Sequence, residues 1–337
     1  RYFRWLFGEI GSFLTEADTT PHKLGLMLVV IALFVLVMGG ILVAVDRPKN
    51  VPRWAVTAGF VGPAILALIF GLVYPAIRTI IASTQKGNSS EFVGLDNYIR
   101  AFSEGQFQIV LRSTALWVIL VPIVSTLVGL VYAVLVDRTK FEKVAKTLVF
   151  LPMAISMVGA SIIWKFVYEY RPTDRPQTGL LNQLLIMVGL DSRQFLLNPP
   201  TNTFFLIAVM VWIQTGFAMT VLSAAIKAIP DDIIEAARLD GLSGTKMFRF
   251  ITVPSIRPAL VVVLTTIAMG TLKVFDIVRT MTGGNFGTSV VANEFYTQSF
   301  RINDGGLGAA LAVILFVLVI PLVVYNIRQM RLAEEIR

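Results

Sequence analysis

Three ionisable residues interrupt an otherwise apolar run near the end of residues 259–281. Lys273, Asp276 and Arg279 follow one another at a spacing of three, which places them on one face of a helix. Inside hydrocarbon, such groups either relay protons or neutralise one another as an ion pair. Because Asp276 lies between two bases, the pattern favours an intramembrane ion pair.

A second group combines aromatic rings with one amide. Trp212, Gln214 and Phe217 lie close together in the middle of an apolar run. Aromatic faces pack against the C–H faces of sugars, and an amide hydrogen-bonds hydroxyl groups. A polar solute needs such side chains along its route through the membrane, so the mixture suits a carbohydrate. The alternative is that the two rings pack against neighbouring helices and that Gln214 forms an interhelical hydrogen bond.

Composition excludes most other chemistries. The chain has no cysteine and a single histidine, His22, which excludes disulfides, thiolate zinc sites, histidine metal sites and catalytic triads. The motif G-x-x-x-x-G-K-[ST] does not occur, so we expect no ATP, Mg²⁺ or other cofactor to bind this chain itself. No paired carboxylates occur at catalytic spacing in the apolar runs, and the sequence does not predict an enzyme.

The elements that carry these residues are predicted to be membrane-spanning helices. The chain of 337 residues is 55% hydrophobic and 15% charged, with a mean hydropathy of +0.74. Helices satisfy every backbone polar group in lipid, and no alternating strands indicate a barrel, so the predicted fold is all-α and polytopic. Seven stretches reach the length of about 20 residues that a span needs: Leu24–Val45, Trp54–Ile81, Phe107–Val136, Val144–Trp164, Thr203–Ile226, Ala259–Met281 and Leu307–Ile327.

The charges of the connections predict the orientation. Fifteen Lys and Arg residues lie in residues 46–53, 137–146, 227–257 and 328–337, against six in residues 82–106, 171–202 and 282–306. Cytoplasmic connections carry the excess of basic residues, so the first set is predicted to be cytoplasmic. This bias explains the net charge of +8 better than binding to nucleic acid does. Seven spans with the C-terminus inside would leave the N-terminus outside. An eighth span before Arg1 would place the start of the chain inside as well.

Residues 230–258 form a polar island between two apolar runs. Pro230 and two aspartates are typical of a helix start, and Gly241 is typical of a helix end. Ser243 is predicted to cap a second short helix, which Pro254 is predicted to stop. Two alanines at 236 and 237 make the first helix thin, and a thin helix fits deep into a cleft of another protein.

This island resembles the EAA loop of the permease subunits of bacterial ABC importers. The matching residues stand at fixed spacing: Glu235, Ala236, Ala237, Asp240, Gly241, Ile251 and Pro254. The resemblance implies a type I importer permease fold and a cytoplasmic coupling helix that docks into an ATPase. It further implies an ATPase dimer that binds ATP and Mg²⁺, a second related permease in a heterodimer and an extracytoplasmic sugar-binding protein. The location would be the bacterial cytoplasmic (inner) membrane.

A second resemblance concerns the solute. The stretch around Trp212 resembles the span that lines the substrate site in maltose-type permeases. It implies solute contacts at Trp212, Ile213, Gln214, Phe217, Gly270 and Thr271. These relatives carry asparagines where this chain has Thr271 and Val274, which leaves the sugar open. Residues 291–296 and 305–312 favour an α-glucoside-like subgroup, with maltose or trehalose as further candidates.

The predicted organisation has four parts. Residues 1–23 are predicted to form an interfacial amphipathic segment, 24–81 accessory spans, 107–327 the core permease with its coupling loop at 230–258, and 328–337 a cytoplasmic tail. The sequence thus predicts a non-catalytic permease subunit of an ABC importer for a carbohydrate. The alternative is a stand-alone ion-driven transporter, which would need buried carboxylates paired across broken helices.

Overall fold

The computed structural model describes residues 20–46, 53–137, 139–172 and 174–335. Most of the predicted amphipathic segment 1–23 lies outside the described residues. The described chain is helical, with one isolated β-bridge between Gln85 and Phe92. It divides into two compact units, residues 1–77 and residues 78–337, which we describe separately.

The first unit contains the two predicted accessory spans. Helix α2 covers Thr20–Asp46, and α3 covers Arg53–Leu68. A π-helical segment, η1 (Ile69–Val73), then leads into α4 (Tyr74–Ala82), which crosses the boundary between the units. Lys23–Gly40 and Thr57–Ala82 are long and apolar enough to cross a membrane, as predicted. Their apolar side chains are mostly exposed, as expected of helices that contact lipid.

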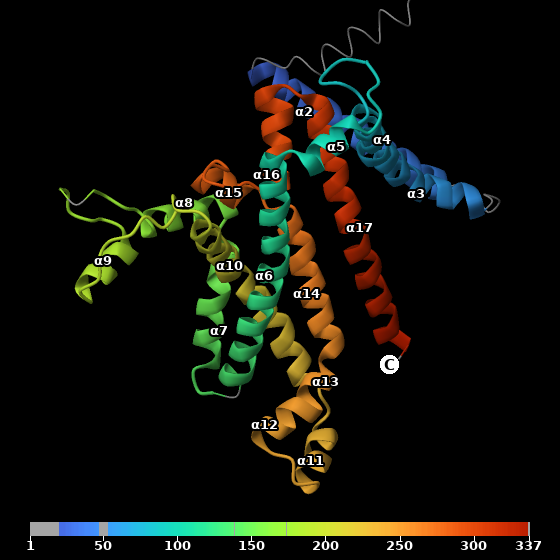
Figure 1. Cartoon of the computed structure of the whole chain (residues 1–337). Coiled ribbons are helices and arrows are strands. Elements are labelled where there is room, and N and C mark those ends of the chain that lie inside the picture. Colours follow the sequence, from blue (N-terminus) through green and yellow to red (C-terminus); the bar gives the residue numbers. More distant parts are fainter. Residues whose placement is uncertain (1–19, 47–52, 138, 173, 336–337) are drawn as a thin grey trace, which may run out of the picture. The chain divides into compact units, whose positions relative to one another are not determined.

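The second unit is built on two long helices that pack closely. After α5 (Asp96–Ser103), helix α6 runs over Gly105–Val136, and α10 runs over Thr201–Lys227 (Figure 1). They approach at Gly129, where a β-carbon would lie 2.6 Å from the β-carbon of Ala218 and 2.7 Å from the nitrogen of Met219. Only a glycine allows this approach, and Met219 and Leu222 are buried beside it.

The fourth predicted span, Val144–Trp164, is not one straight helix. Helix α7 (Glu142–Phe150) continues into a 3₁₀ turn, η2 (Leu151–Ala154), and α8 (Met157–Val167) then leaves at 104°. Pro152 and the extended backbone of Ile155 and Ser156 cause the bend, and the Ser156 hydroxyl caps α8 by accepting the Gly159 N–H at 3.0 Å. The short helix α9 (Leu180–Met187) lies in the connection that follows.

The sixth predicted span, Ala259–Met281, ends early. Helix α14 covers Arg257–Leu272, the chain unwinds over Lys273–Phe275, and α15 (Asp276–Met281) is a separate short helix. Sixteen helical residues rise about 24 Å, less than the roughly 30 Å of a bilayer core. Helix α16 (Val291–Tyr296), the π-helical η4 (Thr297–Ile302) and α17 (Gly305–Glu335) complete the chain.

Five helices among the described residues could cross a membrane, and seven crossings result if each of two bent pairs forms one. The bent pairs are α7–α8 and the segment Gly244–Ser255 with α14, which meet at 68°. In the second unit, helices α11 and α12 extend beyond α6 and α10 at one end, and α16 lies at the other (Figure 1). The main core lies between α6, α10 and α14, around Trp117, Met210 and Ile267.

We predict that Gly129→Ala lowers the stability of the protein by about 2 kcal/mol, because the added methyl group collides with backbone on α10. The measurement is thermal unfolding of the purified protein in detergent. Gly105→Ala on the same helix is the control, since a β-carbon there meets nothing within 4 Å. Equal melting temperatures for the two variants would contradict the close packing of α6 and α10.

Candidate functional site

Helix α10 connects the two predicted functional regions. It carries Trp212, Gln214 and Phe217 in its middle and leads, through Ala228–Pro230, directly into helix α11 (Asp231–Leu239). Asp231 and Asp232 occupy the first turn of α11, where carboxylates complement the helix dipole. A helix therefore forms at the predicted place, with Pro230 as its N-cap rather than its first residue.

Helix α11 has one anchored and one exposed face. Ala237 is only 4% exposed, and Ile234 packs against the main core. Glu235, Ala236 and Asp240 are exposed. Leu239 is 90% exposed, and sequence reasoning did not single it out although it stands only two residues after Ala237. The exposed face of α11 therefore carries Glu235, Ala236, Leu239 and Asp240.

Gly241 forms the turn that ends α11. Its φ of +81° lies in the left-handed region that favours glycine. The Leu242 N–H donates to the Ala237 carbonyl at 2.9 Å, and the Gly241 N–H donates to the Arg238 carbonyl at 3.0 Å. These two bonds are the Schellman pattern, which fixes the direction of the chain as it leaves the helix.

The second half of the loop differs from the prediction. Ser243 is the N-cap of α12 (Gly244–Met247), but its side chain makes no capping hydrogen bond. Pro254 does not stop the helix, because a π-helical segment, η3 (Phe248–Thr252), precedes it and the chain stays helical through α13 (Val253–Ser255). A π-turn accommodates a residue that lacks an N–H group. Ile251 is half-buried and Pro254 is exposed.

Both ends of the loop are fixed to the second unit. Ile229, just before α11, is buried in the main core, and so is Ile256, just after α13. Phe248 packs against the same core. Together with Ile234, these residues give the exposed loop four apolar contacts with the core. A displacement of the loop would therefore act directly on α10 and α14.

The predicted solute residues do not share one surface. Gln214, Phe217 and Gly270 are half-exposed, and a β-carbon at Gly270 would meet nothing within 4 Å. Ile213 and Thr271 are instead buried in helix packing, so the structure does not place them on that surface. The Thr271 hydroxyl donates to the Ile267 carbonyl at 2.7 Å.

One further polar residue on α14 was missed. Thr266 is exposed and stands four residues before Gly270, and the exposed Lys273 caps the helix three residues after Gly270. The spacing puts Thr266 and Gly270 on one stripe of the helix, with Lys273 at its end. A polar stripe on a membrane helix faces a cavity or a protein partner rather than lipid. The three-four spacing was visible in the sequence, but the assumption of a longer helix directed attention to Asp276 instead.

The predicted ion pair of Lys273, Asp276 and Arg279 is not formed. The helix ends at Leu272, so the three residues do not share a helical face, and no salt bridge between described residues includes them. Lys273 caps the C-terminal end of α14 and Asp276 begins α15, where each charge complements a helix end. The Arg279 guanidinium lies 4.8 Å from the ring centroid of Tyr296, as a cation–π contact.

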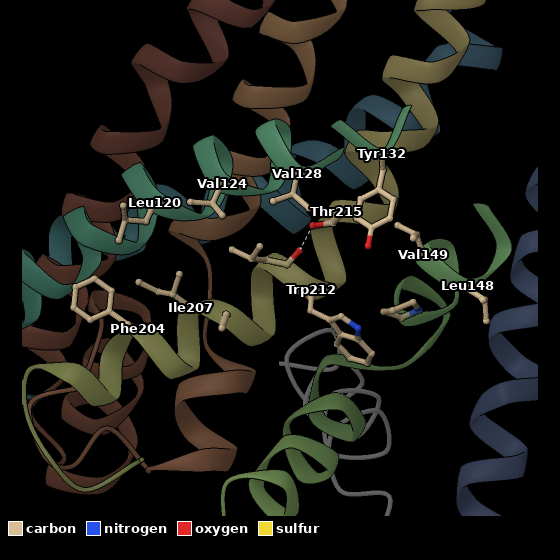
Figure 2. Close-up of a pocket in the computed structure, with 13 residues that line it drawn as sticks. Leu120, Val124, Val128, Tyr132, Leu148, Val149, Phe204, Ile207, Trp212 and Thr215 are labelled. Atoms are coloured by element: carbon tan, nitrogen blue, oxygen red, sulfur yellow. Dashed lines mark hydrogen bonds between the residues drawn. The ribbon is translucent and has the colours of Figure 1, made fainter. Parts of the chain in front are cut away.

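Trp212 faces an apolar groove between α6, α7 and α10 (Figure 2). The groove has a volume of about 730 Å³, and aliphatic side chains such as Val124, Val128 and Ile207 line most of it. Tyr132, Trp212 and Thr215 supply its polar side chains, and the Thr215 hydroxyl already donates to the Val211 carbonyl at 2.7 Å. A solute rich in hydroxyl groups finds few partners there, so this groove suits apolar contacts better than a sugar.

Comparison with known proteins identifies the family. Residues 125–330 match the family described as "Binding-protein-dependent transport system inner membrane component", and this chain belongs to that family. The osmoprotective compounds uptake permease protein GgtC of Synechocystis sp. is 46% identical over 278 residues, which cover 82% of this chain and all of that protein. The alpha-glucoside transport system permease protein AglF of Rhizobium meliloti is 45% identical over 270 residues, 80% of each chain.

The fold agrees with that family. A bacterial ABC transporter involved in the import of the acidic polysaccharide alginate has a chain that superposes with a TM-score of 0.70 at 24% sequence identity. The match covers 82% of this chain and 96% of that one. The chain therefore has the fold of an ABC importer permease, and it is a non-catalytic integral membrane subunit, as the sequence predicts.

We predict that Gly241→Ala raises the hydrogen-exchange rates of the backbone amides at positions 241 and 242 about tenfold. A side chain in the left-handed region costs roughly 1–2 kcal/mol, which weakens the two Schellman bonds. The measurement is hydrogen–deuterium exchange of the purified protein.

Gly241→Asn is the matched control, because asparagine tolerates the left-handed conformation. Its exchange should lie between the wild-type and alanine values. Equal exchange for alanine and glycine would show that the turn does not hold α11 in place.

Proposed function

We propose that this chain is one transmembrane subunit of an ATP-driven importer for a carbohydrate or a related polyol in the bacterial cytoplasmic membrane. One observation supports the proposal most: helix α10 connects the exposed face of α11 directly to a half-exposed polar surface within the spans. The relatives support a sugar or osmoprotectant. Besides GgtC and AglF, the trehalose/maltose transport system permease protein MalF of Thermococcus litoralis is 28% identical over 81% of this chain.

In this proposal, α11 is the coupling helix. Glu235, Ala236 and Leu239 face a groove of a cytoplasmic ATPase, and Leu239 supplies the apolar contact. Ala237 and Ile234 hold the helix against its own subunit. Closure of the ATPase dimer then moves the loop as a rigid body, because Gly241 and the core contacts of Ile229 and Ile256 fix its shape.

The solute route lies on the half-exposed side of α10 and α14. Gln214 and Phe217 on α10 and Thr266 and Gly270 on α14 offer an amide, an aromatic ring, a hydroxyl and exposed backbone. In lipid such a surface needs cover, and a second, related permease subunit supplies it. The cavity between the two permeases opens to an extracytoplasmic binding protein, which delivers the solute.

The chain has no nucleotide chemistry of its own in this proposal. ATP and Mg²⁺ bind to the ATPase, and the permease converts its movement into access for the solute. The relatives disfavour an ion-driven carrier, because those named above are permease proteins of transport systems and the family is defined by its dependence on a binding protein.

The function is tested with the assembled complex in liposomes. The complex of the permease pair, the ATPase and the binding protein should take up labelled maltose, trehalose or another α-glucoside only when ATP is present on the side of the membrane that carries the ATPase. The permease pair without the ATPase should be inactive. Uptake by the pair alone, driven by a proton or sodium gradient, would refute the proposal.

We predict that Leu239→Asp reduces ATP-dependent uptake at least tenfold and releases the ATPase during purification. Burying an unpaired carboxylate in the groove of the ATPase costs several kcal/mol, and the exposed position leaves the fold of the permease unchanged. Leu190→Asp is the control, since Leu190 is an exposed leucine in the connection after α9. An unaltered yield of ATPase with Leu239→Asp would exclude α11 as the docking surface.

We predict that Gln214→Leu raises the KM for the solute by about tenfold, because one hydrogen bond to a solute hydroxyl is lost in a largely desolvated site. The measurement is the concentration dependence of uptake in liposomes. Thr271→Val serves as the control, because the Thr271 hydroxyl is buried and bonded within its own helix. A KM change for Thr271→Val but not for Gln214→Leu would place the route elsewhere.

A further inference from the structure

A network of charged and polar side chains joins three helices just above the coupling loop. The Lys146 ammonium on α7 donates to Asp137, to Ser223 and, at 2.9 Å, to Glu142. The Ser223 hydroxyl lies 2.8 Å and 3.1 Å from the two carboxylate oxygens of Asp137. Lys227 donates to Glu142 and lies 3.9 Å from Asp137. We call these five residues the clasp.

The clasp joins the connection between α6 and α7 to the lower end of α10. Asp137 is the C-cap of α6, and Glu142 and Lys146 lie on α7. Ser223 and Lys227 lie in the last turns of α10, and α11 begins four residues after Lys227. The clasp thus holds the segment that leads from α10 into the coupling loop.

Two different contacts hold α7 to α10. Higher up, the helices touch at Gly216, where a β-carbon would lie 2.7 Å from the Val149 carbonyl oxygen. Below that contact, an open pocket of about 390 Å³ lies along both helices, and the clasp residues Lys146, Ser223 and Lys227 are part of its lining. The polar bonds of the clasp are therefore a second point at which the two helices are fastened.

The charges of the clasp balance. Two carboxylates face two ammonium groups, and Asp137 is only 9% exposed. A carboxylate so poorly hydrated depends on its partners, because removing one leaves a charge that water cannot solvate. Loss of Lys146 would therefore leave Asp137 with only the Ser223 hydroxyl and the more distant Lys227 as partners, which costs more than the loss of one surface ion pair.

We propose that the clasp residues are positioning residues for coupling, which make α7 and its bent continuation α8 move together with α10 when the coupling loop moves. This inference rests on the proposed function, and it adds a second route for the movement beside α10 and α14. Two fastening points, Gly216 and the clasp, make α7 and α10 one rigid body. With one point alone, α10 would swing past α7.

The first test compares Lys146→Met with Lys143→Met in the full complex in liposomes. Lys143 is an exposed residue of the same helix outside the clasp. The readout is the ratio of solute imported to ATP hydrolysed. We expect this ratio to fall about tenfold for Lys146→Met, the effect of losing a hydrogen bond to a charged group, with ATP hydrolysis retained. Lys143→Met should keep the wild-type ratio, and Lys146→Arg should restore much of it.

An unchanged ratio in Lys146→Met would overturn the proposal. If uptake and hydrolysis fall equally, the role of Lys146 is purely structural; if neither falls, Lys146 has no role in coupling. Failure of the importer hypothesis is distinguishable, because the wild-type complex would then show no ATP-dependent uptake at all.

A second test does not depend on the stability of Lys146→Met. The chain has no cysteine, so Asp137→Cys with Ser223→Cys introduces a unique pair at the clasp. Because the pair replaces two clasp residues, the reduced variant should import less solute per ATP, and oxidation should restore this ratio by fastening the two positions together. A further loss of uptake on oxidation, reversed by reduction, would show that the clasp must open and would overturn the rigid-body account. Each single cysteine variant controls for the loss of the native side chain.

Discussion

The close approach of α10 to its neighbours is the constraint on which the second unit depends. Gly129 lets α6 reach the backbone of α10, and Gly216 does the same for α7. Lipid provides no hydrophobic force between apolar helices, so contacts at van der Waals distance have to hold them together, and small residues allow those contacts. Because α6 and α7 both contact the backbone of α10 closely, a displacement of the lower end of α10 also moves these two helices.

Much of this arrangement could be predicted from the sequence. Hydropathy located the helices, because every backbone group in lipid must be satisfied within its own helix. The two-helix loop at residues 230–258 was recognisable because glycine and proline mark its turns, and Gly241 has the left-handed conformation expected at the end of its first helix. The exposed Glu235 and Ala236 also followed from the loop's resemblance to a docking helix.

The remaining features depend on tertiary context that apolar runs do not encode. Ile155 and Ser156 take extended backbone angles that turn one apolar run into two helices at 104°. The break after Leu272 removed the common helical face that the ion pair required. Likewise, Pro254 does not end the second helix of the loop, because a π-helical segment precedes it. The clasp was invisible because it joins residues 86 positions apart.

The exposure of Leu239 has a consequence for the life of the subunit in the cell. In the single chain, the Leu239 side chain and the polar Thr266 on α14 are both uncovered. Under the proposed function a partner covers each of them, so an unassembled copy exposes surfaces of the kind that chaperones and proteases recognise. Unequal synthesis of the proposed subunits would then be corrected by degradation of the surplus copies.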